Sequence, residues 1–372
     1  MTARAIIDST KRSADLLYLA RFNAPDPVIW VEIDGQRALI LSELELDRAR
    51  ETAAADLFLP SKEYYRKAGK DHPAPTHAHV LGAYLAERGI GVVEVPATFP
   101  VLYDRLLASL GVEVKVCEGP FVPERRRKGA QDARTMAEAV RMAAEGIATA
   151  VGMIGASAAR GAELFLDGRP LTSQWVKAEV GKLLLERGYR AADLIVAGVK
   201  EQTCLPHHSG NGPLKAGEAI ILDFFPRDAA TGYHGDVTRT VVKGEAPPRI
   251  RQMHEAARRV EREMAARLRP GAECSKLHEE AVGLFDEAGF PTGREGGRAH
   301  GFFHGLGHGL GLEVHETPHF STPGEVFKEG DIVTLEPGLY YPDAGGVRHE
   351  NVYRITEDGA RCLHEFEVPF EI

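Results

Sequence analysis

Two apolar runs rich in β-branched residues, 219–225 and 237–242, constrain the fold of this 372-residue chain more strongly than any other feature. The short segment between them contains Pro226 and Gly232, which favour a turn. Two strands joined in this way pair as an antiparallel hairpin. The sequence therefore predicts a β-hairpin in the second half of the chain.

Helical and strand-like patterns surround this hairpin in the sequence. Apolar residues recur at helical spacing over about 131–155, 172–187, 248–268 and 275–288. The tail consists mainly of short strand-like runs at 311–315, 331–336, 347–355 and 361–368. We expect an α+β architecture in which helices lie outside a curved antiparallel sheet.

The first 120 residues alternate between the two patterns. A strand over 28–33 is followed by Asp34-Gly35, which is a type I′ turn signal, and by a return strand over 38–41. Helices near 43–55, 75–88 and 101–110 and strands at 92–95 and 112–116 complete a small α/β unit with mixed strands. Proline and glycine cluster in 119–129, so we predict an N-terminal domain of residues 1–122 and a C-terminal domain of residues 123–372.

Composition excludes several classes of protein. The chain is 44% hydrophobic and 27% charged, as in ordinary globular proteins. Its net charge of −9 disfavours binding to nucleic acid, which needs a basic surface. The N-terminus lacks the apolar core of a signal peptide, and no apolar run approaches the roughly 18 residues of a membrane span. We therefore expect a cytoplasmic protein that does not bind membranes.

Four acidic residues stand at the ends of strand-like runs. Asp223 and Asp236 flank the hairpin loop, so they can face each other across it. Glu336 precedes a Pro-Gly turn, and Glu350 lies in another run. Each alone is explained as a solvated strand end, but carboxylates at close range repel unless a cation lies between them. Arg348 is expected on the same strand face as Glu350, as an ion pair or as a support for a metal ligand.

The segment HGLGHGLGLEVHE, residues 304–316, holds His304, His308 and His315. His-x-x-x-His spacing occurs in zinc-binding helices, but the intervening Gly-Leu-Gly disfavours a helix. The spacing of the glycines does not match the dinucleotide-binding pattern either. These glycines instead indicate a backbone that is crowded close to a ligand.

Together, the acidic residues and one histidine form a hard, oxygen-rich ligand set. Such a set suits Mn²⁺, Fe²⁺, Co²⁺ or Zn²⁺ better than it suits ions that prefer thiolates. Two divalent cations would balance four carboxylate charges. Water held between two such ions would lose a proton near neutral pH and become a nucleophile.

Four motifs, in order, resemble those of the pita-bread metallopeptidases, which include aminopeptidase P, prolidase and methionine aminopeptidase. They are LDF with GYHGDVTRT, HGLGHGLGLEVHE, TLEPGLYY and GVRHEN. The resemblance covers about 130–372, and residues 1–118 are similar to the creatinase-type N-terminal domain of aminopeptidase P and prolidase. It implies a pita-bread catalytic domain and hydrolysis of Xaa-Pro bonds in small peptides.

The resemblance also implies two bound metal ions, with manganese as the first expectation and cobalt, iron or zinc as alternatives. Asp223 and Asp236 would bind one ion. His308 and Glu336 would complete the other, and Asp236 and Glu350 would bridge the two.

Further roles follow from the same resemblance. His315 matches the histidine that stabilises the tetrahedral intermediate, and Glu336 matches the proton shuttle. His207 matches a histidine of the catalytic pocket that lines bound substrate. His304 would contact the proline residue or its carboxylate, and Arg348 would support the adjacent metal ligand and a substrate carboxylate.

Two segments depart from the family pattern. Residue 225 is Phe where the family commonly has Gly, and the loop that follows is slightly longer than usual. Residues 291–300 form an additional glycine-rich loop, which is either a lid or a passive surface loop. Neither departure removes a ligand.

Three interpretations are consistent with the sequence. The first is a homodimeric metallopeptidase specific for Xaa-Pro bonds, and the choice between aminopeptidase P and prolidase stays open. The second is a catalytically silent binding protein on the same fold, and the third is a metal-free hydrolase of the creatinase type. Silent and metal-free relatives have no need of a full ligand set, whereas all five ligand positions are filled here.

Overall fold

The computed structural model describes residues 2–70, 72–191 and 193–372. The chain divides into two compact units, Met1–Arg125 and Arg126–Ile372. The domain boundary predicted between residues 122 and 123 lies in the same proline- and glycine-rich stretch. Each unit contains hydrophobic clusters of its own.

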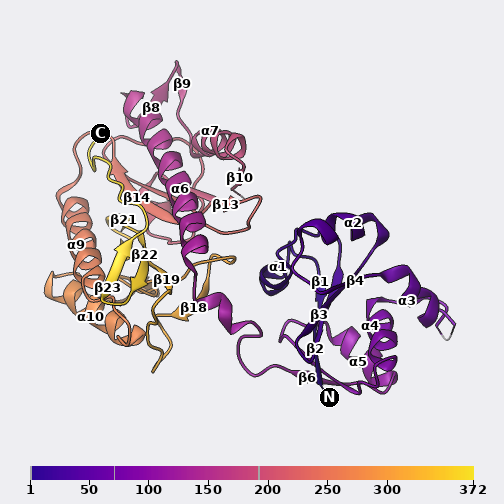
Figure 1. Ribbon diagram of the computed structural model, residues 1–372. Coiled ribbons are helices and arrows are strands. Elements are labelled where there is room, and N and C mark those ends of the chain that lie inside the picture. The colour runs from indigo at the N-terminus through magenta and orange to yellow at the C-terminus, as the bar shows by residue number, and fades with distance from the viewer. Residues whose placement is uncertain (1, 71, 192) are drawn as a thin grey trace. The chain divides into compact units, whose positions relative to one another are not determined.

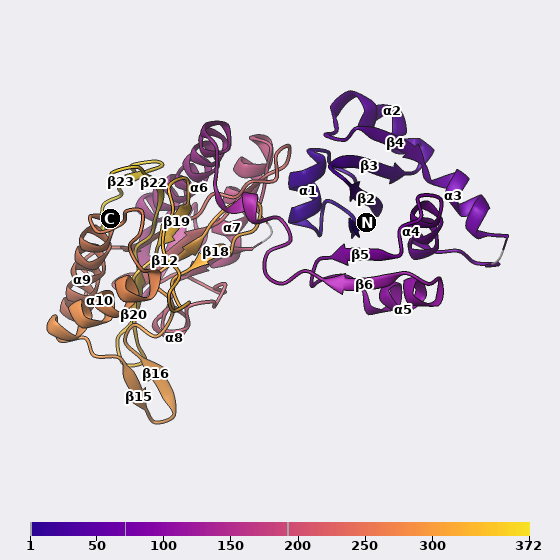
Figure 2. The same ribbon diagram turned by 60° about the horizontal axis from the view of Figure 1, so that its bottom comes forward.

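The first unit is built on a six-stranded mixed sheet with the order β4-β3-β2-β1-β5-β6 (Figure 2). β1 pairs antiparallel with β2 and parallel with β5, so the predicted α/β unit with mixed strands is confirmed. β1 itself is not among the strands predicted from the sequence. The elements are β1 (Thr2–Asp8), α1 (Ala14–Ala20), β2 (Val28–Ile33), β3 (Gln36–Leu41), α2 (Glu43–Thr52), β4 (Leu57–Pro60), α3 (Ser61–Ala68), α4 (His77–Ala86), β5 (Val92–Val95), α5 (Val101–Ser109) and β6 (Glu113–Val116).

The predicted hairpin of β2 and β3 is confirmed. Asp34 and Gly35 have φ values of 49° and 81°, as a type I′ turn requires. Successive residues of β2 alternate between two apolar clusters, with Ile29 and Val31 in one and Trp30 in the other. Both faces of this sheet are therefore covered.

The second unit consists of antiparallel strands with helices outside them (Figure 1), so the predicted α+β architecture is confirmed. Its main sheets have the orders β11-β12-β14 and β18-β17-β19-β22-β23, and β20 pairs with β21. The helices are α6 (Ala130–Ala156), α7 (Ser173–Glu186), α8 (Lys200–Thr203), α9 (Pro248–Ala265) and α10 (Cys274–Glu287). The strands are β7 (Ala158–Arg160), β8 (Glu163–Leu166), β9 (Arg169–Pro170), β10 (Tyr189–Arg190), β11 (Leu194–Ala197), β12 (Ala219–Phe224), β13 (Arg227–Asp228), β14 (Val237–Val242), β15 (Gly293–Glu295), β16 (Arg298–His300), β17 (His308–Gly309), β18 (Glu316–His319), β19 (Ile332–Leu335), β20 (Gly338–Tyr341), β21 (Gly345–Arg348), β22 (Asn351–Thr356) and β23 (Gly359–Cys362).

The long helix α6 packs closely on the hairpin of β12 and β14. A Cβ atom on Gly146 would meet Val180 at 3.0 Å and Phe224 at 3.1 Å, so glycine allows this approach. A Cβ atom on Gly235 would lie 2.2 Å from the backbone of Ala139. Because Gly235 directly precedes Asp236, this contact fixes the position of the Asp236 backbone at the start of β14.

By length and composition alone, α6 could cross a membrane. Half of its most apolar stretch is buried inside the protein, however, and Arg141 on its surface pairs with Glu138 and Glu145. The core helix of a globular protein has the same properties, so α6 is only weak evidence for a membrane span.

Three strand predictions in the tail are wrong in whole or in part. In the run predicted at 361–368, β23 ends at Cys362, and residues 363–368 form no strand. Residues 311–315 form bends, because the Gly311 amide donates to the carbonyl of Glu313 within a tight turn. The run 347–355 is split into β21 and β22, because the Glu350 amide donates to Thr238 of β14. This break turns Glu350 towards the hairpin. The additional loop 291–300 is itself a hairpin, formed by β15 and β16 (Figure 2).

Candidate metal centre

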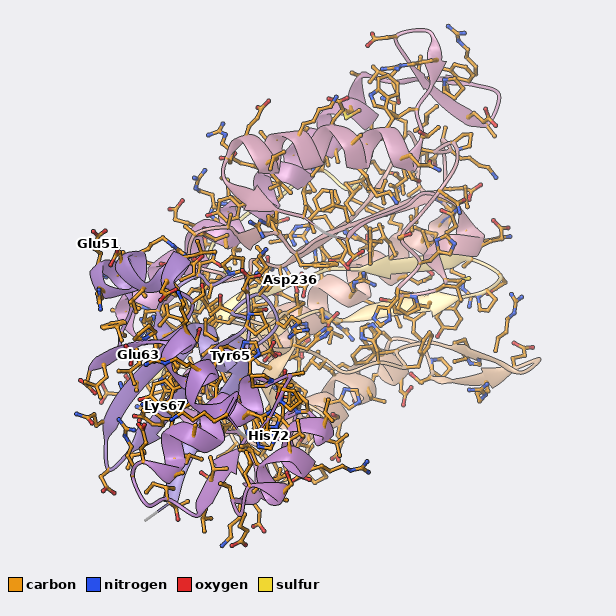
Figure 3. The ribbon with its side chains drawn as sticks, turned by 90° about the vertical axis from the view of Figure 1, so that its right-hand side faces the viewer. Glu51, Glu63, Tyr65, Lys67, His72 and Asp236 are labelled. Atoms are coloured by element: carbon orange, nitrogen blue, oxygen red, sulfur yellow. The ribbon has the colours of Figure 1, made fainter. Side chains whose placement is uncertain are left out.

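The hairpin carries both aspartates as predicted. Asp223 lies in β12 opposite Thr238 of β14, and Asp236 directly precedes β14. Their exposed fractions are 8% and 4%. Surface carboxylates such as Glu51 and Glu63 of the first unit are exposed, whereas Asp236 lies inside the second unit (Figure 3). Burial of two carboxylates at the loop end of one hairpin requires compensation.

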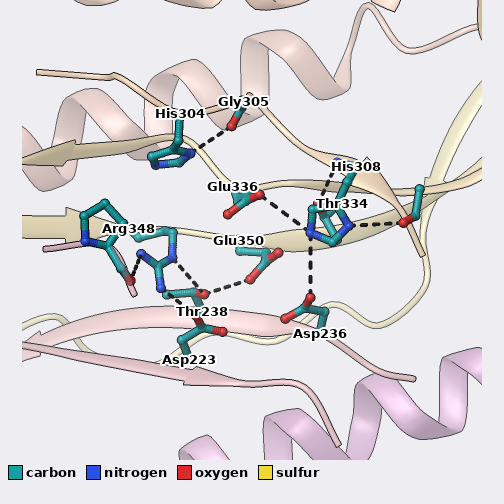
Figure 4. Close-up of polar contacts among 12 residues, drawn as sticks. Asp223, Asp236, Thr238, His304, Gly305, His308, Thr334, Glu336, Arg348 and Glu350 are labelled. Atoms are coloured by element: carbon teal, nitrogen blue, oxygen red, sulfur yellow. Dashed lines mark hydrogen bonds and ion pairs between the residues drawn. The ribbon is translucent and has the colours of Figure 1, made fainter. Parts of the chain in front are cut away.

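His308 and Glu336 come from neighbouring strands of the five-stranded sheet. His308 begins β17, and Glu336 directly follows β19. The His308 Nε2 atom lies 3.6 Å from Glu336 Oε1 and 3.9 Å from Asp236 Oδ2 (Figure 4). The His308 amide donates to Thr334 Oγ1 at 3.2 Å, which holds this residue against β19.

Glu350 is held by two residues that the sequence analysis did not select. Thr238 Oγ1 donates to Glu350 Oε2 at 2.7 Å (Figure 4), and Arg239 Nη1 donates to the Glu350 carbonyl at 2.5 Å. Arg239 is 2% exposed, and its Nη2 atom donates to the Asn351 side chain and to the Phe366 carbonyl. The motif GDVTRT could have indicated both residues. Thr238 and Arg239 are polar residues within an apolar strand, and such residues need hydrogen-bond partners when they are buried.

The buried carboxylates are suited to a cation. Ligand atoms of Asp236, His308 and Glu350 lie within 4.8 Å of one another. Burial, followed by repulsion from Glu350 and Asp223, raises the pKa of Asp236, and burial with repulsion from Glu336 raises that of Glu350. Burial lowers the pKa of His308 to about 3, so its imidazole is neutral and can bind a metal. A divalent cation would remove the repulsion, so these residues fit a metal site.

Glu336 has a different electrostatic setting from the other carboxylates. Burial and the charge of Asp223 raise its pKa to about 7, although Arg348 opposes this shift. Its side chain is 21% exposed, more than that of Asp236. A carboxyl group with a pKa near neutrality can both accept and donate a proton.

Arg348 does not pair with Glu350, contrary to the expectation. β21 ends at Arg348, so the two residues do not share a strand. Its Nη2 atom donates to Asp223 Oδ2 at 2.5 Å (Figure 4). Its Nη1 atom donates to the Tyr340 hydroxyl at 2.8 Å. With 3% exposure, Arg348 is a buried partner of Asp223.

His304 uses both of its ring nitrogens within the protein. Nδ1 lies 2.9 Å from the Gly305 carbonyl, and Nε2 lies 3.0 Å from the Tyr340 hydroxyl. Because that hydroxyl accepts from Arg348, its own proton is directed to Nε2. Burial and Arg348 lower the pKa of His304 to about 3. The residue therefore presents a neutral ring.

His315 and His207 are exposed within the cavity. The His315 ring meets the His308 ring edge-on, with centroids 4.3 Å apart. Burial, followed by the charge of His207, lowers the pKa of His315. Both imidazoles are thus free to contact a bound molecule.

All residues selected from the sequence line one cavity of about 1080 Å³ in the second unit. This volume suits a ligand of several residues. Phe225, the departure from the family pattern, is also on its wall. The selected residues are His207, Asp223, Asp236, His304, His308, His315, Glu336, Arg348 and Glu350.

The glycines near His308 are crowded by protein. A Cβ atom on Gly307 would lie 2.0 Å from the Thr334 carbonyl oxygen, and one on Gly309 would lie 2.3 Å from that of Thr317. Glycine is required because the backbones of β17 and its neighbours come close, which the sequence analysis attributed to a ligand.

Comparison with known proteins identifies relatives for both units. Residues 134–357 match metallopeptidase family M24. The chain is 29% identical over 341 residues to the probable dipeptidase PepE of Mycobacterium tuberculosis, covering 90% of this chain and 83% of that protein. It is 33% identical over 196 residues to the Xaa-Pro dipeptidase of Pyrococcus furiosus, covering 52% and 53%.

Solved structures show the same fold over both units. The prolidase from Pyrococcus furiosus superposes with a TM-score of 0.78 at 23% identity, covering 98% of this chain and 97% of that chain. The X-Pro aminopeptidase from Thermotoga maritima gives 0.82 at 20% identity, covering 100% and 98%. The predicted pita-bread fold with an N-terminal α/β domain is thus confirmed. The matched region contains all five proposed ligands and more than half of the chain, so this chain belongs to metallopeptidase family M24.

Proposed function

We propose that this protein is a metal-dependent peptidase that cleaves Xaa-Pro bonds in short peptides, of the prolidase or aminopeptidase P type. Family membership supports the peptidase activity, and relatives named Xaa-Pro dipeptidase and X-Pro aminopeptidase support the preference for proline. One observation carries the proposal: Asp236, His308 and Glu350 bring ligand atoms within 4.8 Å in a cavity of peptide size.

Two divalent ions, with manganese as the first candidate, would be held by Asp223, Asp236, His308, Glu336 and Glu350. When bound, the ions supply Lewis acidity that activates water and polarises the substrate carbonyl. Thr238 and Arg239 keep Glu350 in place through its carboxylate and its carbonyl. Arg348 orients Asp223 in the same way.

Glu336 carries the proton in this proposal. Its side chain lines the cavity and is 21% exposed, against 5% for Asp236, so it can take a proton from the nucleophile and return it to the leaving amine. His315 and His207 face the cavity and offer N–H donors to the oxygen that becomes negative in the transition state. The neutral ring of His304 offers an apolar surface for a proline ring.

Hydrolysis assays test the proposal directly. Protein stripped of metal by a chelator should cleave an Xaa-Pro dipeptide or an Xaa-Pro-Xaa tripeptide only after Mn²⁺ is restored. Preference for the dipeptide would assign the prolidase type, and preference for the tripeptide the aminopeptidase P type. Absence of cleavage with two ions bound would contradict the proposed substrate, and absence of binding would favour the silent or metal-free interpretations.

We further propose that the protein acts in the cytoplasm and as a homodimer. A net charge of −9 and an ordinary content of charged residues support a dissolved protein. Sedimentation velocity at micromolar concentration tests the dimer, and fractionation of cells tests the compartment.

A further inference from the structure

Helix α7 places one lysine on the wall of the cavity. Among the described residues that line the cavity, Lys177 and Arg348 carry a permanent positive charge. The Arg348 guanidinium makes four hydrogen bonds to protein atoms, including the one to Asp223, and the residue is 3% exposed. Its charge is thus already used inside the protein.

Lys177 is in a different situation. Its Nζ atom donates to the carbonyls of Ser209 at 3.1 Å and Gly210 at 3.0 Å. No carboxylate among the described residues lies within 4.0 Å of it in an ion pair, and burial alone lowers its pKa. An ammonium group has three N–H donors, so one donor and the charge remain for a ligand.

The hydrogen bonds place Lys177 within peptide reach of the carboxylates. The Ser209 carbonyl also accepts from the Val196 amide at 3.0 Å, and the preceding residue, Ile195, pairs with Asp223. With a cross-strand Cα spacing of about 5 Å, these links place Lys177 Nζ within about 14 Å of the Asp223 Cα atom. Three extended residues span about 10 Å, and a carboxylate approaches an ammonium to about 3 Å. A short peptide that begins beside the Asp223 side chain therefore covers this distance and can reach Lys177.

We propose that Lys177 binds the free C-terminal carboxylate of a two- or three-residue substrate and thereby limits the enzyme to short peptides. The proposal rests on the proposed function, because it assumes a peptide at the carboxylate cluster. It assigns to Lys177 the contact that the sequence analysis expected of Arg348. Pairing with a carboxylate also satisfies an ammonium that is partly withdrawn from water.

The test compares each peptide with its C-terminal amide. Ala-Pro, Ala-Pro-Ala and their amides are assayed with the manganese-loaded protein and with Lys177→Met. For the free acids we expect kcat/KM to fall at least about tenfold, which corresponds to about 1.4 kcal/mol, mainly through KM. For the amides, which lack the charge, we expect a change below about twofold.

Two further variants complete the design. Lys177→Arg keeps the charge and should retain most of the preference for free acids. Lys182→Met is the matched control, because Lys182 lies on the same helix, is exposed and pairs with Glu179.

The outcomes separate the alternatives. An equal loss on acids and amides would mean that Lys177 only tethers α7 to Ser209 and Gly210, and would overturn the inference. An unchanged Lys177→Met enzyme would overturn it as well. Failure of the wild-type protein to cleave any of the four substrates would overturn the proposed function first, and this inference with it.

Discussion

The negative charge of the carboxylate cluster is balanced differently on its two sides, which are Asp223 on one side and Asp236, Glu336 and Glu350 on the other. Asp223 has a cation of its own, because Arg348 Nη2 lies 2.5 Å from its Oδ2 atom. Asp236, Glu336 and Glu350 form no ion pair with lysine or arginine among the described residues, and the pKa of each is raised. The protein thus pairs a carboxylate directly with a cation on one side only. On the other side, protons or a metal must balance most of the negative charge.

Negative charge is therefore balanced by a fixed part of the fold on one side, and by protons that can be exchanged for a metal on the other. The guanidinium of Arg348 is part of the fold, whereas protons on Asp236, Glu336 and Glu350 can be displaced by a divalent cation. Metal binding should therefore release protons. Its affinity should also depend on the residues that position Asp236, Glu336 and Glu350.

The largest effect should come from removing a ligand on the uncompensated side. Asp236→Ala or Glu350→Ala should lower metal-dependent kcat/KM by roughly a thousandfold or more, because each carboxylate is proposed to contact both ions. Steady-state kinetics and the metal content of purified protein check this. Asp358→Ala, at an exposed position, serves as the control. Wild-type turnover in either site variant would show that the ligand assignment is wrong.

Removing the cation that pairs with Asp223 should lower the free energy of unfolding. Arg348→Met leaves Asp223 buried without its cation, which should destabilise the metal-free protein by about 3–5 kcal/mol. Chemical denaturation measures this change. Adding Asp223→Asn should restore much of the loss, since the unpaired charge is then removed. A single variant as stable as the wild type would mean that solvent, not Arg348, compensates Asp223.

The stability of the metal-free protein should decrease as pH rises, because of the carboxyl groups that have no cation partner. The folded-state pKa of Glu336 is about 7 against an ordinary value of 4.5, and those of Asp236 and Glu350 are also raised. A raised pKa contributes stability at low pH that is lost as pH rises through the folded value. The melting temperature of chelator-treated protein should therefore fall between about pH 5 and pH 8 through these groups.

Manganese should oppose this fall, because the cation replaces the protons that are lost. Calorimetry in buffers of different ionisation enthalpy should detect proton release on binding. An Asp236→Asn, Glu350→Gln double variant should flatten the pH dependence. A wild-type protein whose metal affinity does not change over this range would contradict the assignment of raised pKa values.

The smallest effect should come from a residue that supports a ligand without binding the metal itself. Thr238→Val removes the hydrogen bond to Glu350 Oε2 at nearly constant volume, and should weaken metal binding about tenfold. Titration with Mn²⁺ measures the change. Thr135→Val is the matched control, because the half-buried Thr135 hydroxyl donates to the Gln131 carbonyl within α6 itself. Equal effects in both variants would argue against this role.

Much of the site could be predicted from local patterns. Asp223 and Asp236 stand at the two ends of a hairpin loop, and the alternation of apolar runs and turn residues is sufficient to predict that hairpin. The order of the motifs was sufficient to select the residues that line the cavity. These predictions succeeded because strand pairing across a short loop depends on residues that are near one another in the sequence.

Contacts between distant segments were decided only by the tertiary structure. Arg348 meets Asp223 across 125 residues, and Thr238 meets Glu350 across 112. The crowding at Gly307 comes from the backbone of β19. No local pattern encodes which of several nearby carboxylates a buried arginine will face, because that depends on where the chain turns after β21. The sequence by itself determined the fold class, the hairpin and the candidate ligands, whereas packing between remote strands decided how each charge is compensated.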